Sequence, residues 1–316
     1  MKTGRSRLKK HRAFLFFIIA LLAASCATAP KVSFSPEQEN RELSILPSGA
    51  RIYLWVDAEK GRPLLDSLSS LYLNGERIPE ILDRTQSAAA AIFPDQSGER
   101  RFFLAASGSY PRSAASFSFA FSKVWKRLKS VTGSSYWHSE KDNISLALGS
   151  KLALVSNTDP YEKFSPEIMP DGFPLFSRGR EFAGWINDPS DFLDNFLLSL
   201  GIPLHVPAED FFFGAVNVGS GGNTAAGWEL VFNIATSSPA QARSLVTLFS
   251  MARLFITRGP PPEFEEGAAS ISPQEAAMLL FANAPELDGN ALILRTNPLD
   301  GDRIALLFSL FSVYSN

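Results

Sequence analysis

The imidazole of His138 is the side chain in this sequence best placed for acid–base chemistry. It lies in the segment YWHSE, where alternate residues of a strand would share one face. Tyr136, His138 and Glu140 would then lie together, and a histidine oriented by a carboxylate can act as a general base. A solvated strand face is the alternative explanation for the same residues. The other histidine of the body, His205, is expected in a loop.

Metal, serine and phosphate chemistry lack their usual patterns. His138 and His205 lie far apart in the sequence and no thiol is available to join them, so we expect no metal site and no cofactor. No G-x-S-x-G motif marks a serine nucleophile. The glycines at 219–222 fail the G-x-G-x-x-G pattern at Thr224 and join two expected strands, which indicates a hairpin turn. We therefore predict that the protein is not an enzyme.

Two further places could bind a partner. Asp57 and Asn187-Asp188 end matching strands before helices, and a paired polar site is possible there, although helix capping explains the same residue types. The segment RGPPPEFEEG at 258–267 is the better candidate, because consecutive prolines favour a stiff extended chain that is ordered at little cost. An exposed, variable loop is the alternative. The candidate partner-binding residues are Pro260, Pro261, Pro262 and Phe264.

Cys26 is the only cysteine of the chain, and the residues before it form an export signal. The apolar run at 13–26 is preceded by six basic residues, Lys2, Arg5, Arg7, Lys9, Lys10 and Arg12. A cationic segment stays on the cytoplasmic side while the apolar run enters the membrane. The run holds about a dozen apolar residues, whereas a helix needs roughly 20 to span a bilayer. We therefore predict a cleaved signal peptide at residues 1–25.

The end of this signal, Leu22-Ala-Ala-Ser-Cys26, resembles the lipobox of bacterial lipoproteins. Ala24 and Ser25 match its small residues, and its usual leucine lies one position earlier here. The resemblance implies that Cys26 becomes the acylated N-terminus and carries fatty acids such as palmitate. Two or three acyl chains anchor a protein stably, at about 0.8 kcal/mol per buried CH2. An ordinary secretory signal with an incidental cysteine is the alternative.

The lipobox resemblance also implies a location. Ala27 stands where the family has an aspartate for inner-membrane retention, which favours the outer membrane and a body exported to the periplasm or cell envelope. Residues 26–45 are polar and contain prolines, so we expect a flexible tether. Beyond residue 26 we recognise no resemblance to a known family.

The composition is that of a globular protein, with 45% hydrophobic and 20% charged residues. Removal of the signal leaves 24 basic and 32 acidic residues, a net charge of −8, which argues against nucleic acid and against electrostatic docking on anionic lipid. Phenylalanine is abundant, at 26 residues. We expect a core rich in phenylalanine, with a cavity for an apolar ligand as the alternative.

The first half of the body predicts the order β-α-β-β-α-β-β. Alternation and β-branched residues indicate strands, and apolar residues at helical spacing indicate helices. The second helix is expected to start at Pro111 and to place Phe117, Phe121, Val124 and Leu128 on one side. The expected strands lie at 51–57, 87–93, 100–107, 136–147 and 151–156, and the first helix starts at Pro63.

The second half repeats this order. Apolar, proline and aromatic residues recur at a constant offset of 128, which indicates an internal duplication. The matching pairs include Leu64 with Phe192, Pro111 with Pro239, and Phe121 with Phe249. A proline-rich loop at 258–271 and a short helix capped by Ser272 and Glu275 are inserted in the second copy. The last residues, from 302 to 314, predict an apolar C-terminal helix.

We therefore predict an α+β fold of two tandem β-α-β-β-α-β-β repeats, at 46–165 and 178–316, with antiparallel-rich sheets and helices packed on one face. The function that fits best is a membrane-anchored envelope lipoprotein with a non-enzymatic binding or structural role. A carrier or sensor of an apolar or lipid ligand in a Phe-lined cavity is the alternative. The expected partners are the membrane, through the lipid anchor, and an envelope protein or apolar ligand, with no nucleic acid.

Overall fold

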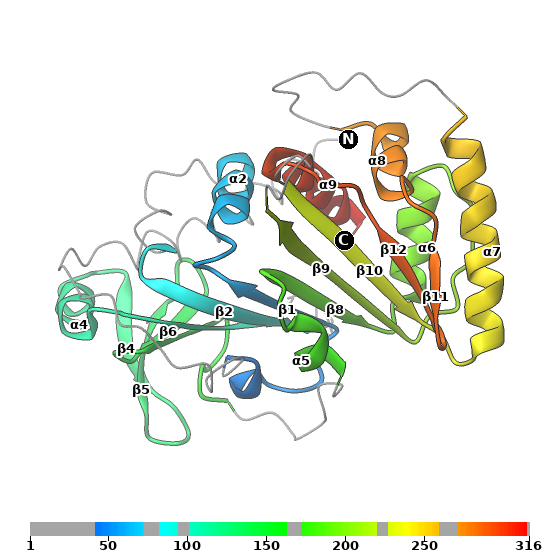
Figure 1. The fold of residues 1–316 in the computed structure, drawn as a ribbon. Helices are drawn as coiled ribbons and strands as arrows, with labels where there is room; N and C mark the ends of the chain where they lie inside the picture. The colour runs from blue at the N-terminus through cyan, green and yellow to red at the C-terminus, as the bar shows by residue number, and fades with distance from the viewer. Residues whose placement is uncertain are drawn as a thin grey trace, which may run out of the picture. The chain divides into compact units, whose positions relative to one another are not determined.

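A computed structural model describes residues 42–72, 82–93, 101–162, 172–219, 227–258 and 271–314 (Figure 1). The chain divides into two compact units, unit 1 from Met1 to Pro174 and unit 2 from Leu175 to Asn316. Both units combine strands and helices, and every strand pairing found in them is antiparallel. The expected α+β class with antiparallel sheet is confirmed at this level.

Unit 1 contains a sheet with the strand order β1-β2-β3-β7-β6-β5-β4. Along the chain, one helix lies between β1 and β2 and another lies between β3 and the edge strand β4. The strands are β1 (Ile52–Asp57), β2 (Thr85–Ile92), β3 (Phe102–Gly108), β4 (Trp125–Lys129), β5 (Ser135–Ser139), β6 (Ile144–Leu148) and β7 (Leu152–Ser156). The helices are the 3-10 turn η2 (Leu43–Ile45), α2 (Arg62–Tyr72) and α4 (Arg112–Ala120).

The helix expected from Pro111 to Leu128 is shorter than predicted, and this expectation is wrong in its second half. The helix α4 ends at Ala120, and residues 125–129 form β4, which pairs with β5. Burial explains the change, because the ring of Trp125 packs on Phe119 with centroids 5.2 Å apart. A helix continued through 125 would give up the ladder with β5. The helical spacing of the apolar residues at 117–128 therefore did not mark a buried face.

Unit 2 contains a sheet with the strand order β11-β12-β10-β9-β8. The strands are β8 (Phe182–Asn187), β9 (Asp210–Val218), β10 (Gly227–Ala235), β11 (Glu286–Asp288) and β12 (Ala291–Arg295). The helices are α6 (Ser190–Ser199), α7 (Pro239–Ile256), α8 (Pro273–Leu280) and α9 (Gly301–Tyr314). The short helix α5 (Gly172–Ser177) crosses the division between the units. After η2 and α5 respectively, both units begin β-α-β-β-α. Unit 1 then has the four strands β4 to β7 where two were expected, so the order β-α-β-β-α-β-β is wrong for it, because residues 125–129 form a strand and the expected strand at 136–147 is divided into β5 and β6. The duplication itself stays a prediction.

Phenylalanine rings pack between the sheet of unit 2 and its helices. Phe211 and Phe213 of β9 stand on the same face of the sheet and contact each other, with centroids 5.5 Å apart. Phe192 of α6 and Phe308 of α9 pack on this face, 6.2 Å from Phe211 and 6.4 Å from Phe213. In this part of the chain the rings contact one another, as a phenylalanine-rich core requires.

Local signals predicted the starts of two helices of unit 2, α7 and α8. The hydroxyl of Ser238 accepts a hydrogen bond from the Gln241 amide and caps α7, with Pro239 in the first turn. Ser272 and Glu275 form the expected capping box at the start of α8. The strands on either side of the expected turn at 219–223 pair as the hairpin β9–β10. Capping and turn residues act over a few positions, so these features depend little on the rest of the fold.

Candidate functional site

Several residues singled out from the sequence lie outside the described parts of the chain. These are the predicted lipidation site Cys26 and the candidate partner-binding residues Pro260, Pro261, Pro262 and Phe264. The structure describes the chain again from Ile271, one residue before the cap of α8.

His138 and Glu140 have other partners than the general-base arrangement requires. The Nδ1 atom of His138 lies 3.1 Å from the hydroxyl of Ser145, on the neighbouring strand β6. The carboxylate of Glu140 accepts a hydrogen bond of 2.6 Å from Nζ of Lys126, and this bond, followed by the charge of Lys126, lowers its pKa. Glu140 is exposed and paired with a cation, so it orients Lys126 rather than the imidazole.

His205 lies in the loop after α6, as expected, and contacts the helix through Asp194. Its Nδ1 lies 2.6 Å from Oδ2 of Asp194, whose Oδ1 accepts the backbone amide of Val206 at 2.8 Å. The aspartate thus fastens the loop to α6. Among the residues that the structure describes, His, Cys, Asp and Glu form no group of three that could hold a metal ion.

The polar residues at the strand ends serve local structure. Oδ1 of Asp57 accepts the backbone amides of Glu59 and Lys60, at 3.1 and 2.9 Å, which closes the turn after β1. Asp188 adopts a left-handed conformation with φ of 50°, between β8 and α6. Asp57 is therefore accounted for by the turn that it closes. The expected capping of α6 by Asp188 is not found, because the N-cap of α6 is Pro189 and no side chain caps it.

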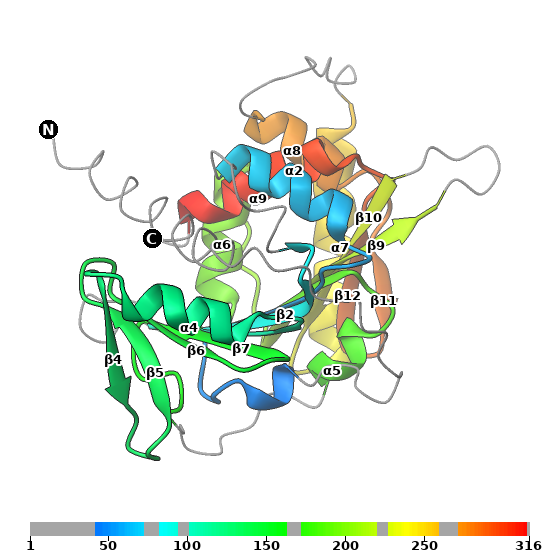
Figure 2. The ribbon, with the colours of Figure 1, turned by 90° about the vertical axis from the view of Figure 1, so that its left-hand side faces the viewer.

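An exposed aromatic pair on α4 is the first candidate surface, and the sequence analysis did not find it. The rings of Phe117 and Phe121 contact each other with centroids 4.7 Å apart, yet their side chains are 69% and 75% exposed. Figure 2 shows α4 beside the sheet of unit 1, with the β4–β5 hairpin at the edge. Together with exposed Lys123 and Val124, these two rings form what we call the α4 patch.

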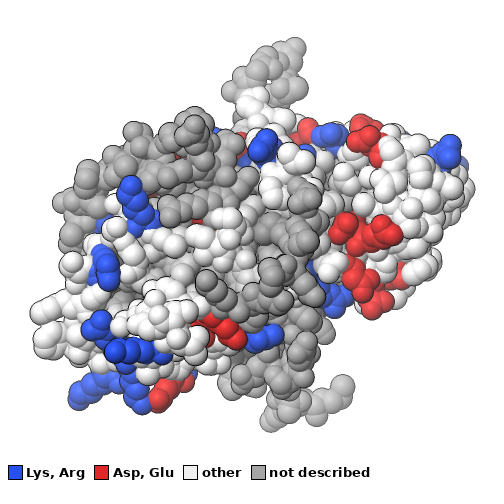
Figure 3. Space-filling view, turned by 90° about the horizontal axis from the view of Figure 1, so that it is seen from below, with Lys and Arg blue, Asp and Glu red and all other residues white. Residues whose placement is uncertain are grey.

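The strand that follows α4 is rich in cations although the protein is acidic overall. All four residues of β4 after its buried first tryptophan are exposed, and three of them, Lys126, Arg127 and Lys129, are basic. Figure 3 shows Lys and Arg side chains gathered on the part of unit 1 that carries α4, β4 and β5 in Figure 1. The net charge of the whole chain does not show where basic residues gather. For this reason the composition argued against an electrostatic contact with anionic lipid.

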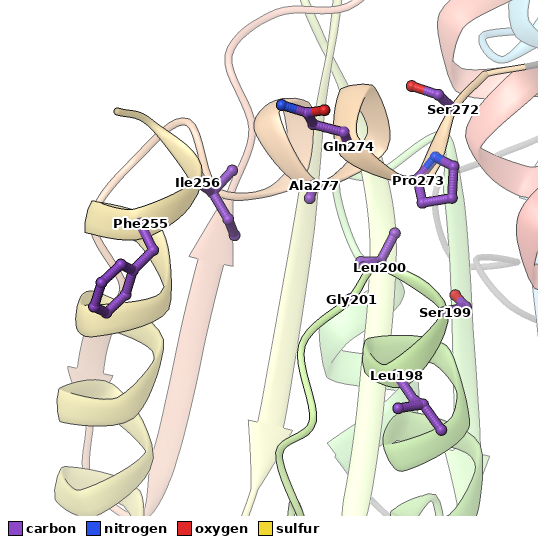
Figure 4. A pocket seen from close by; sticks show the side chains of 10 residues that line it. All are labelled: Leu198, Ser199, Leu200, Gly201, Phe255, Ile256, Ser272, Pro273, Gln274 and Ala277. Atoms are coloured by element: carbon purple, nitrogen blue, oxygen red, sulfur yellow. The ribbon is translucent and has the colours of Figure 1, made fainter. Parts of the chain in front are cut away.

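A pocket in unit 2 is the second candidate site. It has a volume of about 630 Å³ and lies between the C-terminal ends of α6 and α7 and the first turn of α8 (Figure 4). The apolar part of its lining includes Leu198, Leu200, Phe255, Ile256 and Ala277. Leu198 and Phe255 are 61% and 72% exposed, so the pocket is open to solvent.

Polar groups line one side of this pocket. Ser272 and Gln274 come from the start of α8, and the Ser272 hydroxyl accepts the Glu275 amide at 3.2 Å. The positive end of a helix dipole therefore lies beside an apolar wall. Arg258 adds a cation near the rim, with its guanidinium 5.6 Å from the centre of the Phe255 ring. The arrangement suits an amphiphile more than a reaction.

In the parts of the chain that the structure describes, no helix combines the length and the apolar character needed to cross a bilayer.

Comparisons with known proteins correct the expectation that the body resembles no family. The family model for the outer membrane-associated lipoprotein TP0453 matches residues 37–165. The outer membrane protein TP0453 of Treponema pallidum (strain Nichols) is 27% identical over 123 residues, which are 39% of this chain and 42% of that protein. The sequence match thus spans less than half of the relative's length.

Solved structures of TP0453 share the fold of this chain. Crystal form III covers 88% of this chain and 98% of its own, with a TM-score of 0.52 and 17% identity. Crystal form IV covers 85% and 96%, with a TM-score of 0.53 and 18% identity. The chain is therefore similar to TP0453 in sequence over residues 37–165 and in fold over most of its length.

Proposed function

We propose that this protein is an outer membrane-associated lipoprotein, anchored through acyl chains on Cys26, whose body contacts the bilayer through the α4 patch and has no enzymatic activity of its own. The similarity to a protein named as an outer membrane-associated lipoprotein supports the location. The lipobox supports the anchor. The observation that carries the proposal is the exposed aromatic pair on a surface rich in cations.

The α4 patch has the chemistry of a membrane contact. Moving a phenylalanine side chain from water to an apolar environment is favourable by about 1.5–3 kcal/mol, so the burial of two rings favours membrane binding substantially. Each cation near an anionic surface adds about 1 kcal/mol. Neither contribution is large enough for stable binding alone. Combined with a lipid anchor, which holds the body beside the bilayer, they fix how the body lies on it.

Site-specific labelling tests this contact. The full chain, purified from membranes and reconstituted into vesicles, carries Phe121→Cys modified with an environment-sensitive fluorophore. We expect blue-shifted emission that brominated lipids quench. The matched control is Leu254→Cys, which is also exposed but lies in unit 2, outside the lining of the pocket described above. An equal, water-like emission from both labels would rule out the α4 contact.

The same preparation tests the anchor. An acylated Cys26 has no free thiol, because its sulfur forms a thioether with the lipid. The wild-type protein should therefore resist thiol labelling after denaturation, and Cys26→Ala should move from the membrane fraction to the soluble fraction. A freely labelled Cys26 would contradict the anchor while leaving the α4 contact to be judged by its own experiment.

A second candidate function is the carriage of an apolar ligand, and the pocket at the ends of α6 and α7 supports it. Its volume of about 630 Å³ lies within the range of roughly 300–1,000 Å³ typical of ligand pockets. Native mass spectrometry of the purified protein should then show a bound lipid. Leu198→Trp, at an exposed position of the lining, obstructs the pocket and should remove this ligand, whereas Leu254→Trp, at an exposed position outside the lining, should retain it. A ligand-free mass in the wild type would contradict this function.

A further inference from the structure

The sheets of both units end in open, charged edge strands. Within unit 1 the strand β4 pairs with β5 alone, and within unit 2 the strand β11 pairs with β12 alone, among the residues that the structure describes. An edge strand leaves a row of backbone amides and carbonyls available for pairing with another strand. These two edges are therefore places where another sheet could be added.

The two edges are complementary in sequence. On β4, residues Arg127, Leu128 and Lys129 are all exposed. On β11, residues Glu286, Leu287 and Asp288 are all exposed. Each edge thus presents the pattern charged-apolar-charged, with positive charges on β4 and negative charges on β11.

The side chains also alternate in the same way. Trp125 packs on Phe119 of α4, so Arg127 and Lys129, two and four residues later, lie on the α4 face of β4 and Leu128 lies on the other. On β11, Leu287 lies opposite the buried Leu292, and Glu286 and Asp288 lie on the reverse face. When the two edges are aligned, charges can meet charges and leucine can meet leucine.

We propose that copies of this protein associate head to tail, with β4 of one copy pairing antiparallel to β11 of the next. In this register Arg127 lies opposite Asp288, Leu128 opposite Leu287 and Lys129 opposite Glu286. The occupant of each edge is a second copy of this chain, because the chain itself supplies the complementary strand.

Charge decides which edges pair. Two β4 edges would place cations opposite cations, and two β11 edges would place carboxylates opposite carboxylates, and like charges directly opposite each other destabilise a strand pair. Charges on edge strands usually prevent uncontrolled pairing. Here they prevent pairing between identical edges and favour the mixed pair. A contact between two different surfaces is heterologous, so it extends into chains or closes into rings.

The contact is short, and its strength depends on concentration. Three residues on each side bury far less than the roughly 1,200–2,000 Å² of a stable protein interface. We therefore expect weak association in dilute solution that salt weakens further, because the charges are exposed. Attachment to a membrane raises the effective concentration. The pairing uses Arg127 and Lys129, which are also among the cations of the α4 contact, but it does not depend on the two exposed rings or on the pocket.

Carbodiimide coupling, which joins lysine amines to neighbouring carboxylates, tests the pairing on the full chain. Unlabelled and ¹⁵N-labelled protein are mixed at high concentration and low salt, and cross-linked peptides are identified by mass. We expect mixed-isotope links from Lys129 to Glu286 or Asp288. Lys126 and Glu140 form an ion pair of 2.6 Å inside one copy and should give a link without isotope mixing, which controls the reaction.

Charge reversal then separates specific pairing from random collision. Arg127→Glu keeps the amine of Lys129 but places a carboxylate opposite Asp288, so it should abolish the mixed link between the two edges. Combining it with Asp288→Lys should restore association as a charge-swapped pair. Lys151→Glu, an equal change of net charge at an exposed residue outside β4, should leave the link unchanged. A link that is absent from the wild type, or that survives Arg127→Glu, would overturn the proposal. Phe117→Ser with Phe121→Ser should leave the link intact, so failure of the membrane contact is distinguished from failure of the pairing.

Discussion

The indole Nε1 of Trp185, in β8, donates a hydrogen bond of 2.8 Å to Oδ1 of Asp210, at the start of the neighbouring strand β9. Trp185 is buried, so this bond satisfies a donor that would otherwise be removed from water. Trp55 occupies the matching place in β1 of unit 1 and is also buried. Its Nε1, however, has no hydrogen-bond partner among the residues that the structure describes.

Asp210→Ala should destabilise the protein measurably. Removing the acceptor leaves the buried Nε1 of Trp185 unsatisfied, and a lost hydrogen bond to a charged group costs about 1.5–3 kcal/mol. Asp210→Asn keeps an acceptor oxygen and should recover more than half of this loss. Urea unfolding followed by tryptophan fluorescence measures both changes. Equal stability of the wild type and the alanine variant would show that the bond does not contribute.

Ser87→Asn should stabilise unit 1 by supplying the missing acceptor. Ser87 lies opposite Asp57 in the β1–β2 ladder, as Asp210 lies opposite Asn187 in the β8–β9 ladder. An amide oxygen at this position can reach the indole of Trp55, and we expect a gain of about 0.5–1.5 kcal/mol. An asparagine avoids a second carboxylate opposite Asp57. Ser87→Val, which offers no acceptor, is the matched control and should give no gain from this bond.

The sequence predicted features that short segments determine and missed those that depend on partners. Ser272 and Glu275 are three residues apart, and their capping box follows from that spacing. The expected helix to Leu128 failed because a strand at 125–129 is stabilised by β5, the next strand along the chain, and by Phe119. Helical spacing of apolar residues carries no information about such a competing partner.

The candidate sites show the same limit. Helical spacing predicted Phe117 and Phe121 on one side of a longer helix, and no feature of the sequence reveals that Phe119, between them, is the ring that points inward. The pocket in unit 2 is formed by three helix ends that are distant in sequence. By contrast, the charged residues of β4 and β11 can be read from the sequence. Assigning them to a contact between copies requires knowing that both strands are sheet edges.

Two phenylalanines on α7 should respond very differently to truncation. Phe249 is fully buried and packs on Phe281, directly after α8, with centroids 5.6 Å apart, whereas Phe255 is exposed beside the pocket. Phe249→Ala should cost about 3–5 kcal/mol, because it removes buried contacts and leaves a cavity. Phe255→Ala should change stability by less than about 0.5 kcal/mol. Thermal unfolding of the two variants measures the difference. Similar losses of stability from both would contradict the burial of Phe249 and the exposure of Phe255.

The capping box of α8 should give a small stability contribution that depends on pH. The carboxylate of Glu275 accepts the backbone amide of Ser272 at 2.7 Å, and its hydrogen bonding with the Ser272 side chain and backbone lowers its pKa. A carboxyl whose pKa is lower in the folded state stabilises the fold above its unfolded pKa. This contribution is lost as the pH falls through the folded pKa. Because the group is largely exposed, we expect only about 0.3 kcal/mol.

Glu275→Gln and Ser272→Ala separate the two halves of this cap. Glu275→Gln removes the charge, so its difference from the wild type should be present at neutral pH and should vanish below the folded pKa of Glu275, where the wild-type side chain is also neutral. Ser272→Ala removes the hydroxyl that accepts the Glu275 amide, and its cost of about 1 kcal/mol should persist throughout the same range. Urea unfolding at several pH values measures both. Because Ser272 also lines the pocket, a loss of bound lipid in Ser272→Ala but not in Glu275→Gln would indicate that the start of α8 contacts the ligand through the hydroxyl and not through the charge.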